Sequence, residues 1–161
     1  GLAIGSDTCG HRGAMETGYT IAVMPCGLDM VAPSENTGLF LQMIDNGSLT
    51  ISEYPIGHAP TKATYVERDR LQAGIADGLI VLETSEDGGT MHAVRKAVEL
   101  HRPIGCLSPD IVEQTGNQML IDQYGAMPIN TQEDINAFVR ALPKREHSVK
   151  GSILVEQSKL F

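Results

Sequence analysis

Short apolar runs without polar alternation recur along the chain and predict buried strands. Each run is ended by Gly, Pro, Ser or a charged residue, and the four runs are Ile21–Met24, Leu49–Ile51, Leu79–Leu82 and Ile104–Leu107. Strands that are covered on both faces show this pattern, as they do in parallel sheets. We expect Ile21–Met24, Leu79–Leu82 and Ile104–Leu107 to be central strands of a parallel sheet.

Segments with helical spacing separate these runs. The predicted helices are Ser6–Thr17, Glu35–Asn46, Val66–Ala76, Thr90–His101, and two more near Gln118–Tyr124 and Glu133–Leu142. Strands that alternate with helices of this length predict an α/β, Rossmann-like, doubly wound fold. Its sheet is expected to be mainly parallel, with helices on both faces.

The pattern predicts one core over residues 1–142, followed by a basic and apolar tail or linker over 143–161. The Gly-rich turn at residues 1–5 has no strand in front of it. Because a Rossmann-like sheet opens with a strand, a phosphate loop and a helix, we expect these three elements to be absent. The chain begins with Gly1 rather than Met, so we also expect the natural N-terminus to be missing.

The composition is that of an ordinary globular protein, with 42% hydrophobic and 20% charged residues. The net charge of −8 argues against a broad basic face for duplex DNA, although a small basic pocket remains compatible with it. No apolar run approaches the roughly 18 residues that span a bilayer, and no secretion leader is visible. We expect a cytoplasmic protein without membrane contact.

The cysteines Cys9, Cys26 and Cys106 are odd in number and widely spaced. This usage predicts reduced core thiols in a cytosolic protein. No pair has the spacing of zinc ligands, so neither a metal nor another cofactor is expected.

The Gly-rich turn near the start of the chain is the first candidate site. Gly5 allows a tight turn, and Ser6 or Asp7 can cap the following helix, whose free N–H groups could bind an anion. A plain helix cap without a ligand explains the segment equally well. Asp7 and His11 are one helical turn apart, and a structural hydrogen bond between them is favoured over a catalytic dyad.

Positive charge is concentrated in a second candidate segment. Lys62, Arg68 and Arg70 stand in an otherwise acidic chain, and Tyr65 among them could stack on a base. The alternative is a solvated, charged helix start. This segment follows a long connection over residues 52–64, and loops of that length are often functional.

The third candidate is the strand-to-helix turn at Gly88, Gly89 and Thr90. A glycine pair in such a turn lets a phosphate approach the backbone, although such pairs are common. Ligands of open α/β sheets sit beyond the carboxyl ends of the strands. We therefore predict that Lys62, Arg68 or Arg70 meets the helix starts near Ser6 and Gly89 in one crevice.

Five motifs in register resemble the DNA-processing protein A (DprA/Smf) family over residues 1 to 140. The motifs are Gly-Leu-Ala-x-Gly-x-Asp-x-x-x-His-Arg-Gly-Ala at 1–14, Cys26-Gly-Leu-Asp with Pro33-x-Glu-Asn36, Ser52-Glu-Tyr-Pro-x-Gly-x-x-Pro60, Tyr65-x-x-Arg-x-Arg-x-x-Ala-Gly74, and Gly116-Asn-x-x-Leu-Ile-x-x-Tyr-Gly-Ala126. The resemblance implies a cytoplasmic homodimer that binds single-stranded DNA and loads RecA in natural transformation, with no established catalytic step. It places Lys62, Arg68 and Arg70 in a phosphate pocket, with Gly5 and Gly74 allowing close backbone approach.

This sequence departs from the family pattern at three positions, where Ile4, Glu67 and Asp69 stand in place of Arg, Arg and Asn. Each change removes positive charge or adds an acid, so we expect weak DNA binding with a shallow salt dependence. A binding domain for a nucleotide or nucleotide-derived ligand is the alternative. A third hypothesis is an enzyme, a nucleotide phosphoribohydrolase like the related LOG proteins, because Asp87-Gly-Gly-Thr partly matches their Pro-Gly-Gly-x-Gly-Thr loop.

Overall fold

A computed structural model describes residues 1–111 and 115–143 of the chain. The predicted tail therefore lies almost wholly outside the described residues. The strands are β1 (Ile21–Val23), β2 (Leu49–Ile51), β3 (Leu79–Val81), β4 (Ile104–Leu107) and β5 (Met127–Ile129). The helices are α1 (Ser6–Thr17), α2 (Thr37–Asp45), α3 (Lys62–Ile75), α4 (Thr90–Glu99), α5 (Thr115–Tyr124) and α6 (Gln132–Ala141), with a short 3-10 turn, η1 (Ser34–Asn36), before α2.

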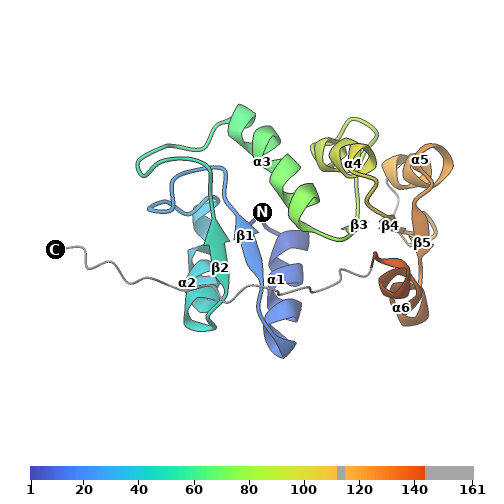
Figure 1. Cartoon of the computed structure of the whole chain (residues 1–161), viewed down its shortest axis with the longest axis horizontal. Helices are drawn as coiled ribbons and strands as arrows, with labels where there is room; N and C mark the ends of the chain where they lie inside the picture. Colours follow the sequence, from blue (N-terminus) through green and yellow to red (C-terminus); the bar gives the residue numbers. More distant parts are fainter. Residues whose placement is uncertain (112–114, 144–161) are drawn as a thin grey trace, which may run out of the picture.

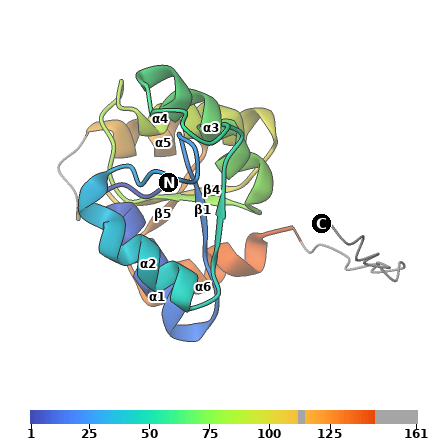
Figure 2. The ribbon, with the colours of Figure 1, turned by 90° about the vertical axis from the view of Figure 1, so that its left-hand side faces the viewer.

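The strands form a parallel α/β architecture, as the sequence predicts. β1 pairs with β2, and β3, β4 and β5 form a second parallel ladder in that order. Helices α3, α4 and α5 cover one face, whereas α1, α2 and α6 cover the other (Figure 2). The fold class is confirmed.

The expectation that β1 and β3 are central strands is wrong for the described part of the chain. Neither strand has a ladder on its second edge, and the two half-sheets lie apart on either side of α3 (Figure 1). Ile21 of β1 and Ile80 of β3 keep 44% and 39% of their surface exposed. An apolar run without alternation indicates that both faces of a strand are covered, but it does not indicate whether neighbouring strands pair with both of its edges.

Each half-sheet has its own hydrophobic core. In the N-terminal half, Leu2, Met24 and Met43 are fully buried together with residues of α2. In the C-terminal half, Val94 and Leu120 are fully buried against the strands. The predicted core thiols are confirmed for Cys26 and Cys106, whereas Cys9 is exposed on α1, and all three cysteines are free.

Helix α3 starts four residues earlier than the apolar pattern predicts. Thr61 accepts a hydrogen bond from the Thr64 amide, and the Thr64 hydroxyl accepts one from the Thr61 amide. This reciprocal capping box stabilises the first turn, so polar residues set a boundary that the hydrophobic spacing does not show. The sequence reading also missed β5, a short strand that contains Pro128.

One buried amide fastens the carboxyl ends of β3 and β4. Asn117 of α5 is fully buried, and its side chain accepts from the Thr84 amide and donates to the carbonyls of Leu82 and Leu107. A side chain at the neighbouring Gly116 would collide with the Thr84 carbonyl. The pair Gly116 and Asn117 of the fifth motif thus has a structural role in this chain, because it connects α5 to the ends of β3 and β4.

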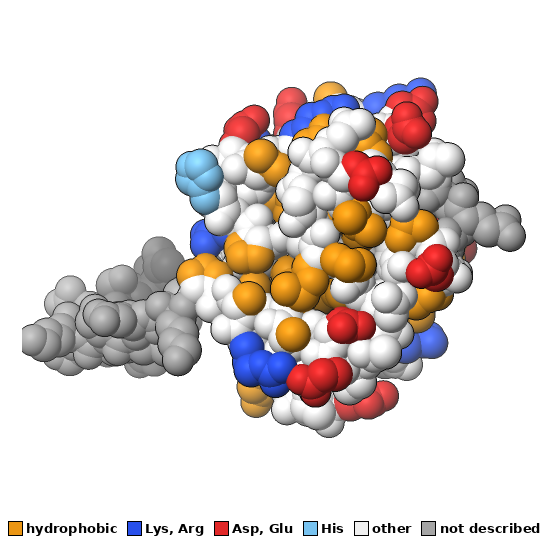
Figure 3. Space-filling view, turned by 90° about the vertical axis from the view of Figure 1, so that its right-hand side faces the viewer, with side chains coloured by type: hydrophobic (Ala, Val, Ile, Leu, Met, Phe, Trp, Pro, Cys, Tyr) orange, Lys and Arg blue, Asp and Glu red, His pale blue; other side chains and the backbone are white. Residues whose placement is uncertain are grey.

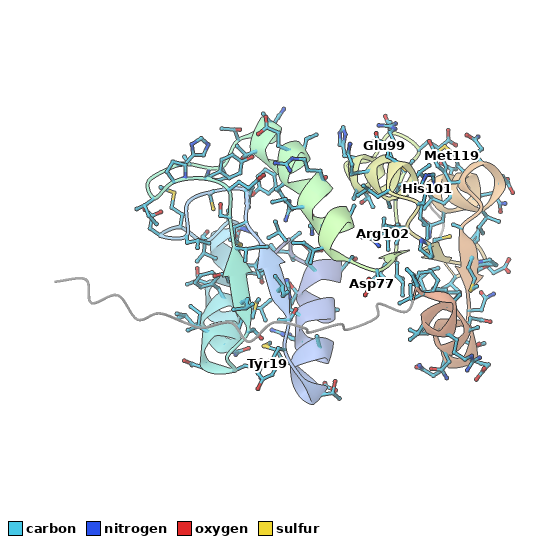
Figure 4. All side chains as sticks on the ribbon, viewed as in Figure 1. Tyr19, Asp77, Glu99, His101, Arg102 and Met119 are labelled. Atoms are coloured by element: carbon cyan, nitrogen blue, oxygen red, sulfur yellow. The ribbon has the colours of Figure 1, made fainter. Side chains whose placement is uncertain are left out.

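A second side-chain to backbone hydrogen bond connects the segments at the amino ends of β3 and β4. Arg102, just after α4, donates to the carbonyl of Gly74 at 3.0 Å and so connects α3 to the turn before β4. Figure 4 shows Arg102 near Asp77 in the loop between α3 and β3. Within the ranges described, no helix is both long and apolar enough to cross a bilayer.

Candidate functional site

A cavity of about 670 Å³ separates the two half-sheets. The edges of β1 and β3 form its sides, with Ile21 on one and Leu79–Leu82 on the other. Helix α1 lines it from one face, and α3 and α4 line it from the other. Three segments of the predicted crevice meet here, since the lining includes Ser6, Arg68 and Gly89.

Arg68 is the buried cation of this cavity. Its Nη1 donates to the Val23 carbonyl at 2.7 Å, and its guanidinium lies 5.6 Å from the centre of the Tyr65 ring. Its Nε is 3.2 Å from the Asp69 carboxylate, which is ion-pair distance, although the geometry is not that of a hydrogen bond. Much of the Arg68 charge is therefore already engaged within the protein.

Carboxylates face the same space. Burial raises the pKa of Asp69 above its usual value even though Arg68 opposes the shift, because the side chain is removed from water. Burial also acts to raise the pKa of Asp7, but the Gly1 amine, the Ala3 amide and Arg68 together bring that pKa below its usual value. Glu83 adds a third carboxylate to the lining, so the cavity offers little net positive charge to a phosphate.

The contacts of Asp7 and His11 correct two sequence expectations. His11 uses both ring nitrogens elsewhere, with Nδ1 2.7 Å from the Thr20 hydroxyl and Nε2 2.7 Å from the Gly1 carbonyl, so no hydrogen bond joins it to Asp7. Asp7 instead accepts from the Ala3 amide at 2.9 Å. Neither Ser6 nor Asp7 caps α1, since the N-cap is Gly5, without a side-chain hydrogen bond.

Two positions in the turn before α1, Gly1 and Gly5, require glycine. Gly5 has φ 92°, a left-handed conformation that side chains disfavour, and so makes the tight turn that the sequence predicts. A side chain at Gly1 would collide with Asp7 and Arg68. Glycine at these two positions lets the chain pass close to the cavity and turn into α1.

The predicted basic residues are not all brought together. Lys62 is exposed at the start of α3, and Arg70 forms an ion pair with Glu53 outside the cavity. Gly74 lies near the end of α3, where its carbonyl accepts from Arg102. Thr90 lines the cavity, whereas Gly88 is in the adjacent turn, where a side chain would meet Thr84 and Ser85.

The three departures from the family pattern lie around this site. Ile4 is 64% exposed just before α1, Glu67 accepts from the Tyr54 hydroxyl at 2.9 Å, and Asp69 is paired with Arg68. Arg substitutions at positions 4 and 67 are therefore sterically accessible. Sequence reasoning missed Gln72 and His92, which also line the cavity. Gln72 could have been found, because it is four residues after Arg68 on the same helix face.

A smaller depression of about 330 Å³ lies between α3 and α4 on the outer surface. Arg70, Arg95 and Lys96 line it together with Glu67 and Glu99. Lys96 forms an ion pair with Glu99, so the charges here are mixed. Over residues 1–111 and 115–143, no group of three His, Cys, Asp or Glu side chains is placed to bind a metal ion.

Parallel strands with helix starts gathered at their carboxyl ends define a Rossmann-like protein with a crevice at that edge of the sheet. The chain belongs to the DNA recombination-mediator protein A family, whose model matches residues 1–140. It is 34% identical over 157 residues to the Smf protein of Synechocystis, and 35% identical over 140 residues to the DNA processing protein DprA of Streptococcus pneumoniae. These matches cover 96% and 85% of this chain but 39% and 49% of the relatives.

Two solved structures share the fold. DprA from Streptococcus pneumoniae superposes with a TM-score of 0.77 at 31% identity, covering 90% of this chain and 50% of that one. DprA from Helicobacter pylori, whose structure was described for its unique single-stranded DNA binding mode, gives a TM-score of 0.79 at 27% identity. That match covers 89% of this chain and 66% of the neighbour. The family resemblance that the sequence predicts is confirmed.

Proposed function

We propose that this chain binds single-stranded DNA at the rim of the cavity, beyond the carboxyl ends of β1 and β3. The observation that carries the proposal is the convergence of the α1 start, the α4 start and Arg68 on one cavity, in a chain of a DNA recombination-mediator family. Helix starts present free N–H groups to phosphates. Family membership and the DNA binding of the Helicobacter pylori neighbour support DNA as the ligand.

Tyr65 and Lys62 are the residues best placed to add affinity. Tyr65 is 38% exposed beside the cavity and can stack on a base, while Lys62 is exposed one turn earlier on α3. Arg68 serves chiefly to position α3 and Tyr65, because Val23 and Asp69 already engage it. Few phosphates are then neutralised, so binding is weak and depends little on salt, with roughly three contacts or fewer.

Fluorescence anisotropy with labelled oligo-dT and a matched duplex, at two salt concentrations, tests the proposal. We expect a preference for oligo-dT, and Tyr65→Ala should weaken binding by roughly tenfold, the value of about one stacked base. Arg140→Ala, which removes a cation on α6, is the control and should change nothing. Equal binding of duplex and oligo-dT, or equal losses in Tyr65→Ala and Arg140→Ala, would contradict this site.

Restoring the charge of the family pattern should strengthen binding. The double substitution Ile4→Arg and Glu67→Arg adds two cations at exposed positions, so we expect tighter binding and a slope of log K against log salt that is steeper by about 1.4, which is about 0.7 for each added phosphate contact on a single strand. Val139→Arg, at a 55% exposed position on α6, adds the same charge elsewhere. If Val139→Arg has the same effect as the Arg substitution at position 4, net charge rather than the rim governs binding.

A mononucleotide or nucleotide-derived ligand is the second candidate. The carboxylates of Asp7, Asp69 and Glu83 in the lining favour it over a longer polyanion, because they repel additional phosphates. Competition decides between the two ligands. A nucleotide that displaces oligo-dT at micromolar concentration, while oligo-dT itself binds only at millimolar concentration, would favour the small ligand.

RecA loading and homodimer formation are further parts of the proposal, and both come from the family resemblance. Figure 3 supports a second copy as a partner, because hydrophobic side chains gather in the middle of the face that it shows, ringed by charged ones. To test RecA loading, the assembly of RecA filaments is measured on DNA single strands that are already covered by a single-strand-binding protein. The measurement is made with and without this chain, and faster assembly in its presence is expected. Light scattering after gel filtration tests homodimer formation.

A further inference from the structure

We propose that a DNA single strand continues from the rim of the cavity into the depression between α3 and α4, where Arg95 binds one of its phosphates. The inference rests on the proposed binding of single-stranded DNA and adds a second contact surface to it. Three observations support it: the two hollows share a wall, the depression offers a cation without an acidic partner among the described residues, and ring side chains lie along the connection.

The cavity and the depression are neighbours that share two lining residues. Val66 of α3 and His92 of α4 line both of them. Helices α3 and α4 pack against one another on the same face of the sheet (Figures 1 and 2). Both shared side chains are exposed, Val66 at 41%. A strand that leaves the cavity between these helices therefore passes Val66 and His92 and enters the depression.

One face of α4 forms a wall of the depression. Residues three and four apart lie on the same side of a helix, and the wall residues of α4 have this spacing: His92, Arg95, Lys96 and Glu99. The opposite side of α4 is apolar and belongs to the core of the C-terminal half, where Val94 is fully buried. Burial of that side fixes the direction in which the polar side faces.

The two hollows differ in the charge that they offer to a polyanion. In the cavity, the carboxylates of Asp7, Asp69 and Glu83 outnumber the guanidinium of Arg68. The depression has three cationic side chains against two carboxylates. Because each nucleotide adds a negative charge, the phosphates that follow the one at the rim are attracted to the depression rather than to the cavity.

Arg95 is the cation of the depression that remains available. Lys96 forms an ion pair with Glu99, and Arg70 forms one with Glu53. Over the ranges that the structure describes, Arg95 takes part in neither an ion pair nor a side-chain hydrogen bond, and its side chain is exposed. Its planar guanidinium can therefore donate two parallel hydrogen bonds to a phosphate without losing a partner in the protein.

Ring side chains lie along the connection between the two hollows. Tyr65 is 38% exposed at the cavity, and the exposed ring of His92 belongs to the shared wall. Unpaired bases stack on the rings of Tyr and His and on the guanidinium plane of Arg. Tyr65, His92 and Arg95 thus combine stacking surfaces with positive charge, which favours a single strand over an acidic protein segment as the occupant.

Fluorescence anisotropy of the 161-residue chain tests the inference with labelled oligo-dT of two lengths, about 4 and about 12 nucleotides. Arg95→Gln should bind the longer strand about fivefold more weakly than the wild type, as expected for the loss of one exposed charged hydrogen bond. Its slope of log K against log salt should be shallower by about 0.7, the value of one phosphate contact on a single strand. The shorter strand, which fills only the rim, should bind both proteins equally.

The readout is the ratio between variant and wild type, because a longer strand offers more binding positions to both proteins alike. Arg140→Gln removes the same charge from α6, on the opposite face of the sheet (Figure 2), and should leave the affinity for both strands unchanged. Glu99→Gln releases Lys96 from its ion pair, so it should tighten binding of the longer strand by about threefold and leave the shorter strand unaffected.

The inference is overturned if Arg95→Gln binds the longer strand as tightly as the wild type does while Tyr65→Ala weakens both strands. The rim would then bind DNA without the depression, and the proposed function would stand. Failure of the proposed function is a different result, since Tyr65→Ala would leave both strands unaffected, and the inference would be lost with it.

Two other outcomes also overturn the inference. Equal losses in Arg95→Gln and Arg140→Gln would assign the effect to net charge. Poly-glutamate that binds the wild type but not Arg95→Gln, with oligo-dT binding unchanged, would assign the depression to an acidic protein segment.

Discussion

The two halves of this protein are held together in different ways. In the C-terminal half, β3, β4 and β5 form a continuous ladder, and the single side chain of Asn117 binds two of its strand ends. The N-terminal half has a shorter ladder, and polar side chains reach across it to backbone groups distant in sequence, as Asn36, His11 and Arg68 do. The comparison teaches that the C-terminal half is organised by strand pairing, whereas the N-terminal half depends on tertiary hydrogen bonds beside an open edge.

The largest expected effect comes from removing the side-chain amide of Asn117, which connects the ends of β3 and β4 in the C-terminal half. Asn117→Ala leaves the Thr84 amide and the carbonyls of Leu82 and Leu107 buried without their partner, so we expect a loss of about 4 kcal/mol in the free energy of unfolding. Urea denaturation measures it. Gln118→Ala, the exposed neighbour on the same helix, should cost less than about 0.5 kcal/mol. Comparable losses would show that α5 itself, rather than the buried amide, is the determinant.

The equivalent test in the N-terminal half is Arg68→Met. This change keeps the apolar stem but removes the bond to the Val23 carbonyl and leaves Asp69 partly buried without its cation. We expect a loss of about 3 kcal/mol in the free energy of unfolding. Arg70→Met removes an exposed pair with Glu53 and should cost less than about 1 kcal/mol. The dependence of the N-terminal half on tertiary bonds would be refuted by equal costs.

Two matched substitutions of helix caps test whether the two halves of the protein unfold independently. Thr61→Ala and Thr131→Ala each remove the capping hydroxyl of a capping box, on α3 and α6, and each should cost about 1 kcal/mol. Because α3 lies between the two cores, Thr61→Ala should accelerate amide exchange in both halves, and Thr131→Ala only in the C-terminal half. Acceleration throughout the molecule in both variants would instead indicate one cooperative unit.

The smallest expected effect is a pH dependence that Asp69 controls. Its pKa is raised in the folded protein above the usual 3.8, so ionisation disfavours folding, and the wild type gains stability relative to Asp69→Asn as the pH falls through the raised pKa. We expect the difference between pH 7 and pH 4 to be less than about 1 kcal/mol. Urea midpoints at both pH values, with the exposed Asp122→Asn as control, measure it. A difference of opposite sign would mean that the ion pair with Arg68 outweighs burial.

The sequence located most elements of the fold but not all of their boundaries. Strands Leu49–Ile51 and Ile104–Leu107 and helix Ser6–Thr17 agree with the prediction at every residue. The errors arose where local polar chemistry sets the boundary, as in the capping box of Thr61 and Thr64, or where a strand is short and contains a proline, as β5 does. Hydrophobic spacing carries neither signal.

The candidate site was only partly predictable. Ser6, Tyr65, Arg68, Gly89 and Thr90 do line one cavity, because segments that follow the carboxyl ends of parallel strands meet at one edge of a sheet. Lys62 lies outside it because it is the first residue of α3, one turn before Tyr65. Arg70 lies outside it because it is two residues after Arg68, on a different face of the helix, where it pairs with Glu53. Their DNA-binding roles stay predictions.

The amino-acid sequence by itself determined the parallel α/β class, the tight turn at Gly5 and the family, because apolar periodicity, glycine and motif spacing are local properties of the chain. Only the tertiary structure decided what the polar side chains contact. It pairs Arg68 with Val23 and Asp69, gives both nitrogens of His11 to partners other than Asp7, and leaves facing edges on β1 and β3. Except for the pair of neighbours Arg68 and Asp69, these contacts join residues that are not adjacent in sequence, and spacing along the chain does not encode which of the distant groups a side chain will reach.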